Sequence, residues 1–390
     1  MVELRTINRV PLLGRTLILL MASMFFNFAT AQQPFVEYSQ RDSTYLKNLH
    51  RRDRSPLTVD QLTARHVHRW QLSARRKLIE LLGIEQIAKD NRGHQCRVVL
   101  QESMPEDGFS RRLGTIETEA GMELPFWLLI PDDSESKERP LAICAQGHGG
   151  NSWNNYAGIY QSSAEREKAL SRNATPGLEA VRRGYITIVP AVRGLASAVS
   201  IADPKSRHGN QLCRAQLIHC LLAGRTAIGE RVWDCQRILD WALDELPQID
   251  SKRVLFTGNS GGGVLTVYMA ALDQRITVAI PSCSFTSYTD TSGFIFHCDC
   301  CLVPRVQSEL GDFSDIGALV APRFLLAVHG KQDGLHYYPA VESAMTNVAR
   351  IYSLLKQEDK FAHRWGEEGH KFYPQLMWPF VENAFAELRK

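Results

Sequence analysis

The sequence predicts an α/β protein with a mostly parallel central sheet. Short apolar runs alternate with helix-like segments over residues 141–388, the pattern of repeated βαβ units. The 390 residues are 44% hydrophobic and 22% charged, which are globular proportions. The formal net charge of +3 is too balanced for binding nucleic acid through bulk charge, so we expect no nucleic-acid partner.

The expected elements follow in chain order. Strands are predicted at 97–100, 124–130, 141–145, 185–189, 254–257, 277–281, 324–329 and 361–365. Helices are predicted at 59–87, 177–183, 224–246, 261–272, 340–355 and 378–388. Residues 284–320 interrupt the alternation, and we expect them to form an insertion over one end of the sheet that helps to shape a pocket together with Trp153.

The N-terminus has the pattern of a signal peptide. Arginines precede an apolar run, and Ala29-Thr30-Ala31 supplies the small residues read at cleavage. The run is about 13 residues, short for a membrane span of roughly 20. We therefore expect residues 1–31 to be removed, the mature chain to be periplasmic or secreted, and no stable membrane span to remain. A retained anchor helix is the alternative. Residues 32–94 are expected to form a loose leader and a helical extension ahead of a catalytic domain at 95–390.

Nine cysteines are present, most of them single residues in apolar surroundings. The exception is the cluster His297-Cys298-Asp299-Cys300-Cys301. This cluster lacks a second Cys/His pair at zinc-finger spacing, so we favour a disulfide that involves it over zinc, with free thiols also open. The sequence does not determine the pairing.

Residues 254–264 contain the strongest local motif, a predicted strand, then Gly258-Asn259-Ser260-Gly261-Gly262, then a predicted helix. A sharp turn there would push the Ser260 side chain clear of the backbone, while the glycines keep Cβ atoms away from neighbouring elements. A phosphate-binding glycine turn and an ordinary connection are the alternatives. We predict that Ser260 is a nucleophile.

A serine nucleophile needs a base, and the base needs an orienting acid. Asp333 follows the apolar strand predicted at 324–329, where sites in open α/β sheets lie. Asp312 and Asp315 are rivals, but they fall in the irregular insertion. We predict that Asp333 is the acid.

His370 is the predicted base, because it lies in the loop between the last strand and the last helix. The other histidines after Ser260 fit less well. His297 precedes the acid, His329 and His336 flank Asp333 too closely, and His363 lies inside a strand.

Acyl transfer also needs donors for the developing oxyanion. The backbone N–H of Gly261 is the first candidate. The glycine-rich loop 145–151 is expected to supply the second, from Gly149 or else Gly150, although a tight turn would need the same glycines.

This ordered set of motifs resembles the α/β-hydrolase superfamily over residues 95–390. Within it the chain resembles exported bacterial acetyl xylan esterases and dienelactone hydrolases, and Arg193-Gly194 is consistent with the first. Acetyl esterases of the cephalosporin-deacetylase type place Gln directly after the serine, where this chain has Gly261.

The expected activity is hydrolysis of a carboxylic ester, with a small-molecule or carbohydrate ester as substrate. We expect no metal and no organic cofactor for this chemistry. A peptidase of the prolyl-oligopeptidase type and a hydrolase-fold binding protein without turnover are the alternatives.

Overall fold

The structure is a computed structural model, and it describes residues 40–50, 57–133, 138–209, 211–289 and 294–389. The expected signal peptide at residues 1–31 and the start of the leader lie outside the described residues. Within the described ranges, no helix is both long and apolar enough to cross a membrane.

The strands of the described chain form one 10-stranded sheet in the order β1-β3-β4-β6-β5-β7-β8-β9-β10, with β2 paired to β3. Strands β6 to β10 of this order run parallel, and the β1, β3 and β4 end is antiparallel. The strands are β1 (Val98–Leu100), β2 (Met104–Pro105), β3 (Phe109–Glu119), β4 (Met122–Pro131), β5 (Arg139–Ala145), β6 (Ile186–Pro190), β7 (Ile249–Asn259), β8 (Val278–Ser282), β9 (Phe324–Gly330) and β10 (Phe361–Gly366). The prediction of a mostly parallel sheet is confirmed.

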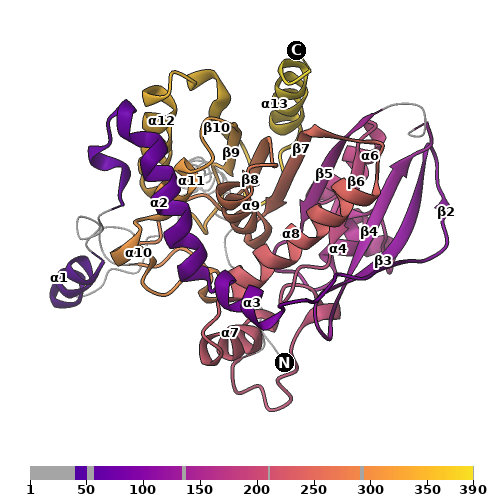
Figure 1. Ribbon diagram of the computed structural model, residues 1–390, viewed down its shortest axis with the longest axis horizontal. Helices are drawn as coiled ribbons and strands as arrows, with labels where there is room; N and C mark the ends of the chain where they lie inside the picture. Colours follow the sequence, from indigo (N-terminus) through magenta and orange to yellow (C-terminus); the bar gives the residue numbers. More distant parts are fainter. Residues whose placement is uncertain (1–39, 51–56, 134–137, 210, 290–293, 390) are drawn as a thin grey trace, which may run out of the picture. The chain divides into compact units, whose positions relative to one another are not determined.

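Helices cover both faces of this sheet (Figure 1). The α-helices are α1 (Gln40–Leu49), α2 (Ala64–Leu82), α3 (Ile84–Asp90), α4 (Ser152–Tyr156), α5 (Ser163–Ser171), α6 (Pro176–Arg182), α7 (Leu212–Leu222), α8 (Ala227–Glu245), α9 (Gly261–Leu272), α10 (Val306–Glu309), α11 (Phe313–Ala318), α12 (Tyr338–Leu354) and α13 (Pro374–Glu387). Short 3-10 turns are η2 (Val59–Gln61), η4 (Ser197–Val199), η5 (Asp299–Cys301) and η6 (Glu358–Lys360).

Two hydrophobic cores lie on the two faces of the sheet. Leu141 and Ile143 of β5 join the core beneath α2, α8, α9, α11 and α12. Ala142 and Cys144, the alternate residues of the same strand, join the core beneath α4, α6 and α13. Because both faces are covered, β5 is apolar and buried from Pro140 to Ala145, without polar alternation.

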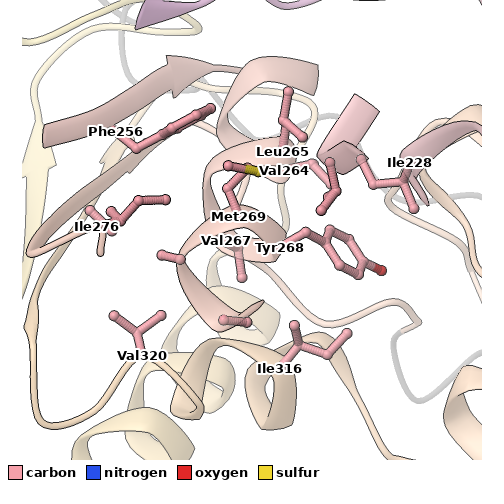
Figure 2. Close-up of a cluster of buried hydrophobic side chains, with 14 of the residues drawn as sticks. Ile228, Phe256, Val264, Leu265, Val267, Tyr268, Met269, Ile276, Ile316 and Val320 are labelled. Atoms are coloured by element: carbon pink, nitrogen blue, oxygen red, sulfur yellow. The ribbon is translucent and has the colours of Figure 1, made fainter. Parts of the chain in front are cut away.

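Helix α9 is buried along almost its whole length (Figure 2). Its side chains meet Phe256 of β7 on one side, Ile228 of α8 on another and Ile316 of α11 on a third. A helix that is apolar all round belongs in the interior. The helix that follows Ser260 is therefore fixed on every side, which fixes the position of its first residues.

The structure also corrects part of the sequence prediction. The leader was expected to be loose, but Gln40–Leu49 forms helix α1, none of whose residues is buried. This helix therefore forms without an apolar face packed on the core. Strand β3 and helices α4, α5 and α7 were not resolved as separate elements from the sequence, because their apolar residues do not repeat at one clear period.

Candidate active site

Ser260 lies at a sharp turn between β7 and α9. Its backbone has φ 59° and ψ −124°, a conformation that costs energy for a residue with a side chain. A Cβ atom on Gly258 would lie 2.5 Å from the Ala145 carbonyl oxygen, and one on Gly262 would collide with the same oxygen. Glycine is required at both positions because the end of β5 packs directly against this turn. The Ser260 N–H donates to the Ser282 carbonyl at 2.9 Å, which holds the turn to β8.

Asp333 and His370 come from the loops after β9 and β10 and form a hydrogen bond. The distance from His370 Nδ1 to Asp333 Oδ2 is 2.7 Å. The two loops are joined by backbone bonds, since the Lys331 N–H donates to Gly366 and the Gln332 N–H donates to Glu368. The relative position of acid and imidazole is therefore set by the sheet and not by the side chains alone.

Asp333 is in the ionised state that an orienting acid requires. Burial raises the pKa of this carboxyl, but hydrogen bonds from His336 and His370 outweigh burial and hold the pKa well below its usual range. The Leu335 N–H also donates to Asp333 Oδ1 at 3.0 Å. Asp333 is therefore charged throughout the range in which a histidine titrates.

Ser260 and His370 line the same cavity, whose volume is about 570 Å³. Gly261 and Val264 line it from the start of α9, and His336 and Leu335 line it from the Asp333 loop. The insertion contributes the wall made of Phe296, His297, Cys298, Asp299 and Cys301. The expectation that residues 284–320 shape a pocket agrees with this geometry.

Trp153, expected to shape the pocket as well, does not line this cavity. Its ring stacks on Trp127 with the centroids 6.0 Å apart, and the residue is buried in the core beneath α4. This position could not be predicted from the sequence, because an aromatic residue just after a glycine loop can line a cavity or pack in the core.

The glycine-rich loop after β5 reaches Ser260 through Gly147. A Cβ atom on Gly147 would lie 3.0 Å from Ser260 Cβ and 3.2 Å from the Gly261 nitrogen. A Cβ atom on Gly149 would instead have only Ser152 within 4 Å, and one on Gly150 would meet Ser197. His148 lines the cavity, whereas Gly149 does not. The loop was predicted from the sequence, but the placement of Gly147 against Ser260 and of His148 in the cavity lining was not.

The rival acids have structural roles. Asp312 and Asp315 form a reciprocal capping box at the start of α11. Asp315 also accepts from the Val59 N–H, and Asp312 accepts from the Tyr288 N–H. Both carboxylates therefore satisfy backbone donors and do not line the cavity.

Three of the rival histidines contact groups other than an acid of the cavity. His297 lines the cavity wall, but its Nε2 lies 3.3 Å from the Thr286 carbonyl, and burial lowers its pKa to about 3. His329 Nδ1 lies 3.1 Å from His363 Nε2, and burial lowers the pKa of both rings. His336 is different, because its Nδ1 lies 3.3 Å from Asp333 Oδ2 and it lines the cavity.

Arg193, in the loop after β6, is the centre of a buried ionic cluster. Its guanidinium bonds Asp234 at 2.5 Å and Glu119 at 2.7 Å, and Glu230 lies 3.3 Å away. Arg193 is 8% exposed and Asp234 1%. Such a buried ionic cluster links β3 and α8 to the loop after β6.

Comparisons with known proteins show which sequences and folds this chain resembles. Residues 168–290 match the acetyl xylan esterase family model. Over 141 residues the chain is 28% identical to YtaP of Bacillus subtilis, whose name assigns it provisionally to the hydrolases. That match covers 34% of this chain and 45% of YtaP, less than half of the relative's length.

Solved structures resemble the fold over most of the chain. A Bacteroides fragilis protein, provisionally described as an acetyl xylan esterase, is 17% identical with a TM-score of 0.68, and the match covers 91% of this chain and 100% of that one. Methylesterase BT1017 is 20% identical with a TM-score of 0.63, and the match covers 90% of this chain and 69% of that one. The chain therefore has the α/β-hydrolase fold and resembles acetyl xylan esterases, as its sequence motifs predicted.

Proposed function

We propose that the protein is a serine hydrolase that cleaves a carboxylic ester through Ser260, His370 and Asp333. The observation that carries the proposal is the 2.7 Å bond from His370 to Asp333, with His370 and Ser260 facing one cavity. A nucleophile, a base and an orienting acid on three separate loops are what acyl transfer by a serine requires.

The reaction would proceed in two halves. His370 takes the Ser260 proton as Oγ attacks the ester carbonyl, and the protonated imidazole then gives the proton to the leaving alcohol. Asp333, charged and fixed by two loops, stabilises the imidazolium. Water then hydrolyses the acyl-enzyme with His370 again as the base.

The tetrahedral oxyanion would be held by backbone donors. The Gly261 N–H is one donor. It lies at the N-terminus of α9, where the helix dipole favours negative charge. The second donor would come from the loop 147–149. Gly149 was expected in this role, but the approach of Gly147 to Ser260 favours the His148 N–H.

For the substrate we propose an ester carried by a carbohydrate. The acetyl xylan esterase match over residues 168–290 supports an acetyl ester, and the structural likeness to a methylesterase makes a methyl ester the competing choice. We further propose that the protein is exported. This rests on the signal-like segment 1–31 and on the extracellular location of carbohydrate polymers that carry such esters. The N-terminus of the mature protein, sequenced from the native host, tests this point.

Fluorophosphonate labelling and ester hydrolysis test the triad together. Ser260→Ala should abolish labelling, and His370→Ala should slow it greatly. Because residues of a triad act as a unit, Ser260→Ala, His370→Ala and the double variant should share one low residual rate. Losses that multiply in the double variant would contradict the proposal. Asp333→Asn should lose about 10⁴-fold in kcat while remaining folded.

A substrate panel tests the ester class. Acetylated xylose, a methyl uronate, a longer acyl ester and a prolyl amide should be compared at equal concentration by kcat/KM. The proposal expects the acetyl ester to be preferred. A preference for the methyl uronate would change the proposed substrate from an acetyl ester to a methyl ester. Cleavage of the amide would indicate a peptidase.

A further inference from the structure

Four potential metal ligands meet beside the active-site cavity, although they come from three distant parts of the chain. His148 belongs to the loop after β5, Cys213 to α7, and Cys298 and Cys300 to the insertion. One ligand atom of each residue lies within 4.8 Å of every other. His148 and Cys298 also line the cavity, which provides a path for an ion to enter.

Two of the six distances in this set are close to the edges of a tetrahedral zinc site, and none exceeds 4.8 Å. With Zn–S bonds near 2.3 Å and Zn–N bonds near 2.0–2.1 Å, a tetrahedron has S···S edges of about 3.8 Å and S···N edges of about 3.6 Å. Cys300 Sγ lies 3.8 Å from Cys298 Sγ and 3.3 Å from His148 Nε2. A disulfide would instead need sulfurs about 2.05 Å apart.

The charge around the cluster also indicates a metal. Arg231 is fully buried, and its guanidinium bonds the Cys300 carbonyl at 3.3 Å and Cys300 Sγ at 3.4 Å. Its other bonds within the described chain go to the Arg193 carbonyl, the Gln216 amide and the Cys301 sulfur, and none goes to a carboxylate. A buried cation needs an anion. A zinc ion with three thiolates and one neutral imidazole carries a net charge of −1, which balances Arg231.

We propose that His148, Cys213, Cys298 and Cys300 bind one zinc ion in a closed, structural site. Four protein ligands leave no open position, so the ion takes no part in ester cleavage and the proposal does not depend on that activity. Its role is to tie the cavity wall and α7 to the loop beside Ser260. The Gly147–His148 segment is then positioned through the His148 side chain.

Metal content and thiol state test the proposal directly. The wild-type protein is purified without chelator, and zinc per chain is measured by mass spectrometry of the digested sample. Cys213→Ser and Cys298→Ser are compared with Cys96→Ser, a matched control at a half-buried cysteine outside the cluster. We expect about one zinc per chain in the wild type and in the control, and loss of most of the zinc in both cluster variants.

Alkylation of the wild type covers the case in which a cluster variant fails to fold. A zinc site leaves all nine cysteines open to alkylation after denaturation with chelator and no reductant. In the native protein, Cys298 should be protected until a strong chelator is added. Two thiols that react only after reduction, mapped to this cluster, would show a disulfide and overturn the proposal. Wild-type protein without zinc after exposure to it, with its thiols free, would overturn it as well.

Discussion

His336 and His370 contact the same carboxylate oxygen of Asp333. The two Nδ1 atoms lie 3.3 Å and 2.7 Å from Oδ2, and the ring centroids are 6.1 Å apart with an angle of 29° between the ring planes. Both rings line the cavity. Geometry therefore offers two imidazoles for one acid, and the shorter bond and separate loop favour His370 as the base.

Substitution of each histidine separates these roles. His336→Asn should keep kcat within about tenfold, because the bond from His370 to Asp333 does not depend on it, whereas His370→Ala should lose about 10⁴-fold or more. Initial rates on an acetyl ester measure both. Equal losses would mean that the two histidines act together, and a larger loss at His336 would make it the base.

Alanine at Gly147 and at Gly149 tests which part of the glycine loop faces the oxyanion. A Cβ on Gly147 would lie 2.5 Å from the Asn259 carbonyl, so the loop must move away from Ser260. We expect a loss of about 10²–10³-fold in kcat, the range for a displaced oxyanion donor. Gly149→Ala meets only the Ser152 side chain and serves as the control. A larger effect at Gly149 would restore it as the donor.

Removal of Arg193 should strongly destabilise the fold. Arg193→Met leaves the buried Asp234 without the cation that bonds it and leaves Glu119 paired to Arg225 alone, which costs about 3–5 kcal/mol in the free energy of unfolding. Arg97→Met is the matched control, because its side chain is 68% exposed and exposed pairs contribute about 1 kcal/mol or less. Urea unfolding measures both. A small loss at Arg193 would mean that the carboxylates are neutral or rehydrated.

The free energy of unfolding should fall as the pH is lowered, in part through His363. Burial lowers its pKa to about 4, although Glu342 lies nearby, while an unfolded histidine titrates near roughly 6.5. The unfolded chain therefore binds more protons between these values, and stability present above pH 6.5 or so is lost as the pH falls toward 4.

The contribution of one such histidine is about 1.4 kcal/mol per pH unit. His363→Gln should reduce the slope of unfolding free energy against pH by up to this amount, and it retains a side chain able to bond His329. Urea unfolding at several pH values between about 4.5 and 7 measures the slope. An unchanged slope would show that His363 has the same pKa in the folded and the unfolded chain.

The sequence predicted eight of the ten strands of the described sheet and the candidate triad because each signal is local. Ser260, Asp333 and His370 each follow an apolar strand, and parallel strands place their carboxyl ends at one edge of the sheet. The loop that approaches Ser260 was also found, but not which of its residues does so. The path of the backbone through Gly147 and His148 depends on packing against the turn at Ser260. The spacing of residues in the sequence carries no information about this packing.

The cysteine–histidine cluster could not be predicted in the same way. Cys298 and Cys300 were recognised as unusual, but their partners His148 and Cys213 lie far away in the chain. Helix α7, which carries Cys213, was not predicted at all. Only the tertiary structure brings these ligands together from three segments. A search of the sequence for closely spaced Cys/His pairs therefore finds Cys298 and Cys300 but not the other two ligands.

The cavity wall at residues 296–301 lies on a different connection of the fold from the candidate reacting groups. The candidate reacting groups lie on short turns after β7, β9 and β10, while this wall belongs to the connection between β8 and β9. In the proposed esterase, exchange of the wall between relatives would therefore alter which ester fits without moving the candidate reacting groups. Cys298 and Cys300 limit this freedom, since a grafted segment that lacks them would also release the anchor of the loop beside Ser260.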